Sequence, residues 1–306
     1  MSNQAEEEVI VKKNKTLRVI TGVIISIIAL SAIALGSIPL YVMMGLIVFL
    51  CTKEFIKILN HKGFYPSFSV MLFADIVLLT LTFFHRFDLM PPILTLVIMA
   101  SFLSVLFKGR QPYIVNVATT ILGALYCAWL PCHILLIRQI GMTRISAFQF
   151  SPSEGLGLLL FVFVAVALTD IGAYYFGVNF GRHKLAEVIS PKKTVEGAIG
   201  GGLLAIAASA VGVFYTELSL CQALIGGLIV TLSAQLGDLS ESLIKRDAGV
   251  KDSSNILPGH GGMLDRFDGY IFAIPVTYYY FMHFTHGKNV LVEFFEYLGR
   301  VINVYF

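Results

Sequence analysis

Acidic and basic side chains that could carry out chemistry on phosphates are concentrated between residues 238 and 268. This stretch is about a tenth of the chain and holds six of its 19 acidic residues. Carboxylates, water and substrate phosphate oxygens together suit Mg²⁺, which seldom has a cage made only of protein groups. Histidine and cysteine are too sparse here for a zinc site. The acids of the stretch are Asp238, Glu241, Asp247, Asp252, Asp265 and Asp268.

A turn rich in glycine lies inside this stretch. Residues 256–262 read Ile-Leu-Pro-Gly-His-Gly-Gly, a run that cannot continue a helix. Gly261 and Gly262 would let the backbone approach a ligand closely and present N–H groups to an anion. We expect His260, in the same turn, to act as a hydrogen-bond donor. The cations around the turn, which can neutralise bound polyanions, are Lys245, Arg246, Lys251 and Arg266.

The residues before this turn are expected to form the end of a long helix. Thr231, Gln235, Asp238, Ser242 and Lys245 recur at steps of three or four residues and therefore share one helix face. An isolated carboxylate is costly where an apolar helix leaves the bilayer, so Asp238 is a candidate functional residue. The alternative is a solvated cytoplasmic loop whose charges form surface ion pairs.

A second basic cluster occupies residues 190–197, which read Ser-Pro-Lys-Lys-Thr-Val-Glu-Gly. Ser190 or Thr194 could cap the following helix, and Lys192 and Lys193 would then lie near its positive end. Two ammonium groups in that place suit a phosphate ligand and do not favour the helix itself. A simple positive-inside anchor is the alternative interpretation.

Two further acids lie inside apolar stretches. For Asp170, a structural hydrogen-bonded carboxylate and a functional group are both open interpretations. Asp75 has no polar neighbours at helical spacing, and the sequence assigns no role to it. The glycines at 197 and 200–202 are not preceded by a strand, so we predict that they let two membrane helices pack closely instead of binding a nucleotide.

The elements that must position these groups are membrane helices. The chain of 306 residues is 57% hydrophobic and 13% charged, with a mean hydropathy of +0.80. An average soluble domain is about 25% charged, so this composition excludes a soluble globule. The net charge of +3 is too small to indicate a nucleic-acid partner. Four cysteines without C-x-x-C spacing indicate neither a disulfide framework nor a zinc knuckle.

The fold class that follows is an all-α polytopic membrane protein with about nine transmembrane helices. The stretch without charge between Arg18 and Lys53 is too long for one helix across a hydrocarbon core of about 30 Å. Gly36, Ser37 and Pro39 supply a break. Apolar stretches are expected near 17–36, 39–59, 66–84, 91–107, 113–137, 155–178, 197–216, 219–246 and 268–285.

The distribution of Lys and Arg predicts the orientation of these helices. With the N-terminus in the cytoplasm, the inner segments hold 17 of these residues and the outer segments five. We therefore expect an uncleaved cytoplasmic tail at 1–16, about five transmembrane helices in 17–150, and a catalytic transmembrane region at 151–306. The C-terminus falls on the opposite side. A bacterial inner (plasma) membrane, with the site facing the cytoplasm, fits the short tail.

The run from Ser242 to Asp268 resembles a known signature. It reads Ser-Leu-Ile-Lys-Arg, four residues, Lys-Asp, and later Leu-Pro-Gly-His-Gly-Gly-Met-Leu-Asp-Arg-Phe-Asp. This is similar to the signature of the phosphatidate cytidylyltransferase family, the CDP-diacylglycerol synthases. Residues 190–197 and Gly237-Asp238-Leu239 also resemble family motifs, so the resemblance covers about 165–285.

The resemblance implies that CTP and phosphatidate react to give CDP-diacylglycerol and pyrophosphate. It implies Mg²⁺, as two ions held by Asp238 and Asp265, and a homodimer in membrane lipid, whereas the sequence leaves open whether a monovalent cation joins the metals. The candidate catalytic residues are Asp238, Lys245, Arg246, Lys251, His260, Asp265, Arg266 and Asp268. The candidate substrate-binding residues are Ser190, Lys192, Lys193, Thr194, Asp252, Gly261 and Gly262.

Three other functions are weighed against this one. A cation- or proton-coupled transporter could use intramembrane acids such as Asp75 and Asp170, but the sequence shows no internal repeat. A CDP-alcohol phosphotransferase would carry an Asp-Gly-x-x-Ala-Arg pattern, and Asp268-Gly269 is not followed by an arginine in this way. A membrane scaffold without activity would leave the acids of 238–268 unexplained.

Overall fold

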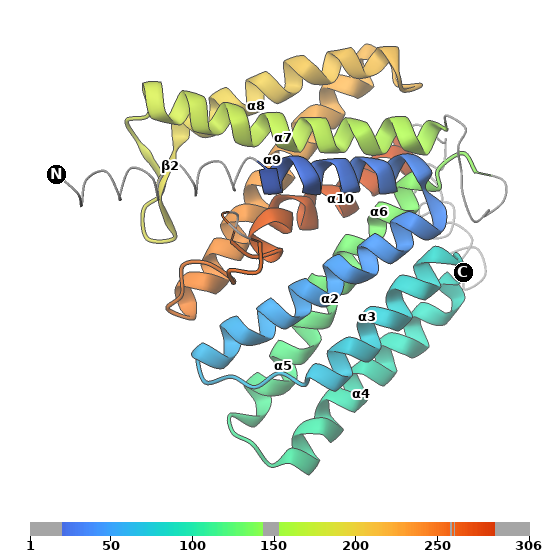
Figure 1. Ribbon diagram of the computed structural model, residues 1–306, viewed down its shortest axis with the longest axis vertical. Coiled ribbons are helices and arrows are strands. Elements are labelled where there is room, and N and C mark those ends of the chain that lie inside the picture. Colours follow the sequence, from blue (N-terminus) through green and yellow to red (C-terminus); the bar gives the residue numbers. More distant parts are fainter. Residues whose placement is uncertain (1–19, 143–152, 258, 260, 285–306) are drawn as a thin grey trace, which may run out of the picture.

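The computed structural model describes residues 20–142, 153–257, 259 and 261–284. Over these residues the chain is mainly a bundle of helices (Figure 1). A helix over Ile20–Leu35 comes first. It is followed by α2 (Ser37–His61), α3 (Phe68–Phe83), α4 (Met90–Lys108), α5 (Tyr113–Ala124), α6 (Leu130–Arg138), α7 (Glu154–Phe180), α8 (Val195–Ser209), α9 (Leu220–Asp247) and α10 (Leu264–Phe284).

Five helical stretches of the described residues are long and apolar enough to cross a membrane. They are Phe87–Lys108, Tyr113–Arg138, Glu154–Phe180, Val195–Phe214 and Leu220–Asp247, where short 3₁₀ turns, η1 (Phe87–Leu89) and η3 (Ala210–Phe214), extend α4 and α8. Each of the nine apolar stretches expected from the sequence overlaps helix. The prediction of a multi-helix membrane protein is confirmed in this form.

In the first half of the chain, one local feature separates two helices and another joins two helices. Gly36 has a φ of +60° and separates the helix that ends at Leu35 from α2. A five-residue π-helix, η2 (Leu125–Trp129), joins α5 to α6 just before Pro131. Proline has no N–H for the preceding turn, and the wider π turn accommodates this loss. The expected stretch 113–137 is therefore one continuous helical segment.

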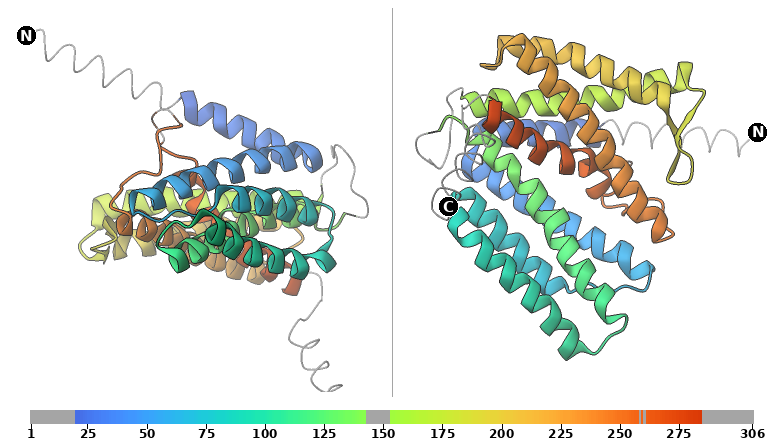
Figure 2. Two further views of the ribbon diagram at one scale, coloured as in Figure 1. Left: turned by 90° about the horizontal axis from the view of Figure 1, so that it is seen from below. Right: turned by 180° about the vertical axis from the view of Figure 1, so that it is seen from behind.

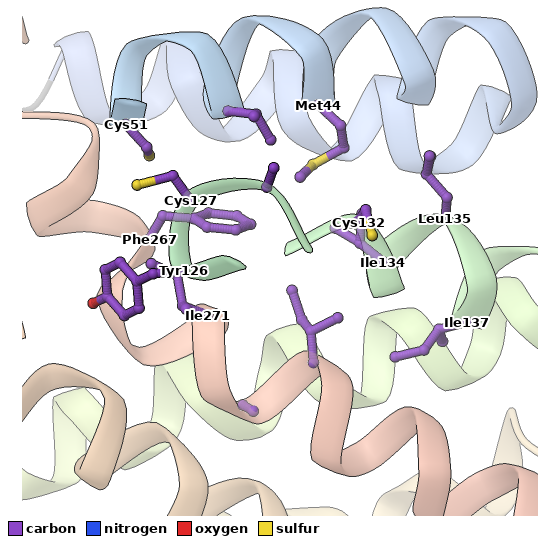
Figure 3. Close-up of a cluster of buried hydrophobic side chains, with 14 of the residues drawn as sticks. Met44, Cys51, Tyr126, Cys127, Cys132, Ile134, Leu135, Ile137, Phe267 and Ile271 are labelled. Atoms are coloured by element: carbon purple, nitrogen blue, oxygen red, sulfur yellow. The ribbon is translucent and has the colours of Figure 1, made fainter. Parts of the chain in front are cut away.

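A buried cluster connects α2, η2, α6 and α10 (Figure 3). Met44 of α2 and Cys127 of η2 are fully buried, and Phe267 of α10 packs into the same cluster. In lipid the hydrophobic effect does not drive helices together, so close van der Waals packing of these side chains holds the helices against one another. The helices before and after residue 150 therefore share one core, which fixes α2 next to the signature segment.

Glycines allow α7, α8, α9 and α10 to pack backbone against backbone. A Cβ atom at Gly201 would lie 2.4 Å from the Thr169 carbonyl oxygen, so only glycine fits there. The close approaches at 197 and 200–202 confirm the packing role predicted for these glycines. The premise that no strand precedes them is wrong, because a strand over Ser190–Thr194 ends just before α8. A Cβ at Gly237 of α9 would likewise lie 2.6 Å from the carbonyl oxygen of Asp268. α9 and α10 therefore lie side by side, as Figure 2 (right) shows, and Asp238 stands next to α10.

The all-α expectation missed a small hairpin. β1 (Lys184–Ala186) and β2 (Ser190–Thr194) pair antiparallel, with Lys184 opposite Thr194. Thr194 then caps α8, because its Oγ1 accepts a hydrogen bond from Gly197 N–H at 3.1 Å. Of the two caps that the sequence allowed, the structure uses Thr194. The strands were missed because Ser-Pro-Lys-Lys-Thr has no alternation of apolar and polar residues.

Candidate active site

Asp265, in the first turn of α10, is surrounded by hydrogen-bond donors. Its Oδ1 accepts from Lys245 Nζ at 2.7 Å, and its Oδ2 accepts from Gly262 N–H at 2.8 Å. Ser253 donates both its N–H and its hydroxyl to Oδ2, at 3.1 and 2.9 Å. The Asp265 side chain is only 10% exposed. The carboxylate is therefore already well supplied with protein donors.

Lys245 connects Asp265 to a second buried acid. On α9, Lys245 also forms an ion pair with Glu241, whose side chain is fully buried. An uncompensated buried carboxylate is strongly destabilising, and this one ammonium group is shared by the two acids. These contacts define the Asp265 cluster, which consists of Glu241, Lys245, Ser253, Gly262 and Asp265.

A second group of charges, the Asp238 cluster, lies about one helical turn earlier on α9 and is more open. Asp238 forms an ion pair with Lys193 of β2, and the two side chains are 30% and 28% exposed. Asp170 of α7 interacts electrostatically with Asp238, Lys193 and Arg266. Asp268 of α10 interacts with Asp238 and Asp170. Four elements thus bring together Asp170, Lys193, Asp238, Arg266 and Asp268.

The two clusters meet through the acids of α9 and α10. Asp268 interacts electrostatically with Glu241 of the Asp265 cluster as well as with Asp238. The structure therefore joins the predicted residues Asp238, Lys245, Asp265, Arg266 and Asp268 into one polar region. Asp75 is buried in α3 and belongs to neither cluster.

The hairpin presents Lys193 to α9. Arg246 fixes the turn of the hairpin, because its Nε donates to the Ile189 carbonyl at 3.1 Å. Its Nη1 donates to the Val250 carbonyl at 3.2 Å, so Arg246 also holds the loop that follows α9. Lys193 is half-buried, whereas Lys192 is exposed, and Ser190 begins β2.

Lys251 and Asp252 line a cavity of about 320 Å³ between the loop after α9 and the end of α2. Lys57 and His61 of α2 line its other wall. Small-molecule sites usually measure about 300 to 1,000 Å³, so the cavity is at the lower end of that range. These two predicted residues therefore face a polar cavity beside the Asp265 cluster.

The glycine-rich turn differs from the expectation in one respect. Gly261 has a φ of +80°, which requires glycine, and its carbonyl accepts from Leu257 N–H at 2.9 Å. The N–H of Gly262 binds Asp265 instead of pointing toward an external anion. The expected contact of the Gly262 N–H with a substrate anion stays a prediction, and it would require this N–H to leave the Asp265 carboxylate. His260 lies outside the described residues.

Sequence reasoning missed Glu54 of α2. Its carboxylate is 1% exposed and accepts hydrogen bonds from Ser253, Ser254 and the N–H groups at the start of α10. Glu54 was overlooked because Lys53 and Lys57 lie beside it, so in the sequence it is typical of an acid in a local ion pair at the end of a helix.

Comparisons with known proteins identify the family. The model of the "Cytidylyltransferase family" matches residues 16–284. The chain belongs to the cytidylyltransferase family. The phosphatidate cytidylyltransferase of Synechocystis sp. is 34% identical over 290 residues, which cover 87% of this chain and 96% of the relative. The enzyme of that name from Staphylococcus saprophyticus is 34% identical over 270 residues, 85% of this chain and 96% of the relative.

A third relative is more similar over a shorter range. The phosphatidate cytidylyltransferase of Staphylococcus haemolyticus is 48% identical over 131 residues, which cover 42% of this chain and 50% of the relative. The resemblance inferred from residues 242–268 is confirmed, and the family match extends it to the first half of the chain. The family match thus includes the helices on both sides of residue 150, which also share one core.

Members of the cytidylyltransferase family generally depend on a divalent metal, and the residues present fit one. Among the described residues, no three His, Cys, Asp or Glu side chains are close enough to hold a metal without other ligands. Mg²⁺ usually takes one or two carboxylates and completes its shell with water and substrate phosphates. The acids of the Asp238 cluster outnumber its bases, and its anionic groups are all carboxylates. This donor chemistry suits a hard cation.

Proposed function

We propose that the chain is a phosphatidate cytidylyltransferase, which converts CTP and phosphatidate into CDP-diacylglycerol and pyrophosphate. A phosphate oxygen of phosphatidate attacks the α-phosphorus of CTP and forms a new P–O bond. The bond from the α-phosphorus to the bridging oxygen breaks, and pyrophosphate leaves with the electron pair. The observation that carries the proposal is the family match over residues 16–284.

The residues of the polar region suit this reaction. The phosphate of phosphatidate is already ionised, so the attack needs little help from a protein base, and catalysis consists mainly of positioning and charge stabilisation. Two polyanions must meet, and the side chains that would neutralise them are Lys192, Lys193, Lys245, Arg246, Lys251 and Arg266. Among these residues, Lys193 has the best support as a phosphate-neutralising group, because it is half-buried and forms an ion pair with Asp238, a proposed metal ligand.

Mg²⁺ is the proposed metal, with Asp238 and Asp265 as its protein ligands. When bound, the metal would neutralise phosphate oxygens of CTP and make the α-phosphorus more electrophilic. The partial exposure of Asp238 and the nearby acids Asp170 and Asp268 support its assignment. Asp265 is assigned by its place in the signature, and its donors hold the carboxylate in one orientation.

We further propose nine spans in a bacterial plasma membrane, with the N-terminus and the site on the cytoplasmic side. Contacts between loops support the alternation of sides, and the Lys and Arg count supports the cytoplasmic assignment. Segments assigned to the inner side meet one another, because Lys62 Nζ pairs with Asp247 at 3.1 Å and Arg246 binds the Ile189 carbonyl. Segments assigned to the outer side meet at the other end, where Gln139 Nε2 donates to the Phe83 carbonyl at 3.1 Å.

Phosphatidate keeps its acyl chains in lipid, so the site is proposed to open sideways into the inner leaflet near the ends of α9 and α10. A homodimer is proposed from the family resemblance, and light scattering of the purified protein tests it. The transporter alternative is not supported, because the family match is to cytidylyltransferases over most of the chain.

The test of the function is a product assay. Purified protein in phosphatidate-containing vesicles is incubated with CTP labelled in the cytidine and with Mg²⁺. The expected result is label in the lipid fraction that requires phosphatidate and disappears with a chelator of divalent cations. Water-soluble label only, with folded protein, would contradict the proposal.

A further inference from the structure

The carboxylate of Glu54 contacts the signature segment across about 200 positions of sequence. Oε1 accepts from the Ser254 hydroxyl at 2.5 Å and from Met263 N–H at 3.0 Å. Oε2 accepts from the Ser253 hydroxyl at 3.0 Å and from Leu264 N–H at 2.7 Å. Each oxygen thus binds one hydroxyl of the loop after α9 and one N–H at the start of α10. All four partners are neutral, although the carboxylate is only 1% exposed.

Glu54 therefore acts as a helix cap supplied by another helix. The first N–H groups of α10 have no partner within α10, and the positive end of the helix dipole favours a negative charge there. Caps usually come from the residue that begins the helix. Here the cap comes from α2, so it fixes α10 relative to the first half of the chain as well as closing the helix end.

The same contacts reach Asp265. The Ser253 hydroxyl lies 3.0 Å from Glu54 Oε2 and 2.9 Å from Asp265 Oδ2, so the two carboxylates share it. Gly262 lies between them. A Cβ atom there would approach Glu54 Oε2 to 2.6 Å and Ser253 Oγ to 1.9 Å, whereas the N–H of Gly262 binds Asp265. A glycine is needed at 262 because Glu54 comes so close.

We infer that Glu54 is a positioning residue for the cytidylyl transfer, acting through Ser253 and the first turn of α10 on the orientation of Asp265. This inference rests on the proposed function for its activity readouts. Glu54 does not touch the Asp238 cluster in any described contact. Glu54 thus sets the position of Asp265, one proposed metal ligand, and does not affect Asp238, the other.

A glutamine at position 54 is the sharpest substitution. It keeps the size and shape of the side chain, but its NH₂ group faces either Met263 N–H or Leu264 N–H, whichever way the amide is turned. One backbone donor of α10 therefore loses its acceptor. Asp75→Asn is the matched control, because it removes another buried carboxylate of the α2–α3 region, one with no hydrogen bond to the described residues of 253–264.

The experiment compares full-length parent, Glu54→Gln, Ser254→Ala and Asp75→Asn in the product assay at varied Mg²⁺ and CTP. Misplacement of a reacting group by about 1 Å can cost about 100-fold in rate, so we expect Glu54→Gln to lose at least about 10-fold in kcat. The Mg²⁺ concentration for half-maximal rate should rise several-fold, with KM for CTP nearly unchanged. Ser254→Ala should shift both quantities in the same direction by less, and Asp75→Asn should shift neither.

Hydrogen–deuterium exchange of residues 253–264 supplies a second readout. It should be faster in Glu54→Gln than in the parent, whether or not the parent forms product, so failure of the proposed function and failure of this inference are distinguishable. Parent-like kcat and Mg²⁺ dependence in a folded Glu54→Gln protein, or equal losses in Asp75→Asn, would overturn the inference. If Glu54→Gln does not fold, unchanged Mg²⁺ dependence in Ser254→Ala overturns it.

Discussion

The two charged clusters of the polar region differ in how far the protein shields them from solvent. The Asp265 cluster is closed, since Lys245, Ser253 and Gly262 supply donors to a carboxylate that is only 10% exposed. The Asp238 cluster is open, because the side chains of Asp238 and Lys193 are about 30% exposed. The buried donors of the Asp265 cluster hold the Asp265 carboxylate in one orientation, whereas the exposure of the Asp238 cluster leaves Asp238 and Lys193 within reach of a substrate. The difference indicates a preset ligand in the first cluster and substrate contact in the second.

The largest expected effect is on stability at the closed cluster. Lys245→Met keeps the aliphatic chain but leaves Glu241 and Asp265 buried without their cation, which should cost about 3–5 kcal/mol. Lys193→Met at the open cluster should cost less than about 1 kcal/mol, because its partner is partly solvated. Denaturant titration of the purified proteins measures both. Equal losses would remove the distinction between the clusters.

At the open cluster, a substitution should reduce activity strongly while it changes stability little. Asp238→Asn should reduce turnover roughly 1,000-fold, as loss of a group that stabilises transition-state charge does, while the unfolding midpoint stays near that of the parent. Initial rates of lipid-linked product and a thermal melt of the same preparation check this. Substantial turnover in the folded variant would count against Asp238 as a metal ligand.

A smaller effect is expected from Gly262→Ala. The added methyl group would meet Ser253 Oγ and Glu54 Oε2, and such overpacking should destabilise the protein by about 1–3 kcal/mol. Gly45→Ala of α2 is the control, because its Cβ would make only an ordinary contact of 3.7 Å with Leu79. Denaturant titrations compare the free energies of unfolding of the two variants. An unchanged value for Gly262→Ala would show that Ser253 and Glu54 do not pack tightly against residue 262.

The smallest effect concerns substrate affinity. Lys193→Ala should raise KM for CTP about 10-fold with part of kcat retained, because one charge-assisted phosphate contact is lost. Lys192→Ala, which changes the exposed neighbour, should have less effect. Steady-state kinetics at saturating Mg²⁺ measures both, and unchanged KM for CTP and phosphatidate in Lys193→Ala would place Lys193 outside the site.

The helices were predictable because a chain this apolar must satisfy its backbone groups within helices when it lies in lipid. The break at Gly36 followed from local residue types in the same way, whereas the cap of α8 was narrowed only to Ser190 or Thr194. The signature proposes Asp238 and Asp265 for a similar reason, since the chemistry of a phosphate site restricts which residues can serve there. These predictions depend on short stretches of sequence.

Contacts between distant helices were not predictable from these patterns. Periodicity shows which face of α2 is apolar, but not that Glu54 meets residues 253–264. Nor does it show that Lys245 lies between Glu241 and Asp265 while Lys193 reaches Asp238. Such pairings depend on how the helices pack, and here that packing is set by glycines such as Gly237, at which α9 approaches α10.

Chemical labelling of lysines tests the central claim most directly. The purified protein is treated with an amine-acylating reagent with and without CTP and Mg²⁺, and modification of Lys193 is measured by mass spectrometry, with exposed Lys184 as the internal reference. We expect Mg²⁺ and CTP together to protect Lys193 several-fold and to leave Lys184 unchanged. Equal modification of Lys193 in both conditions, at CTP concentrations that saturate turnover, would contradict the assignment of the open cluster to the nucleotide.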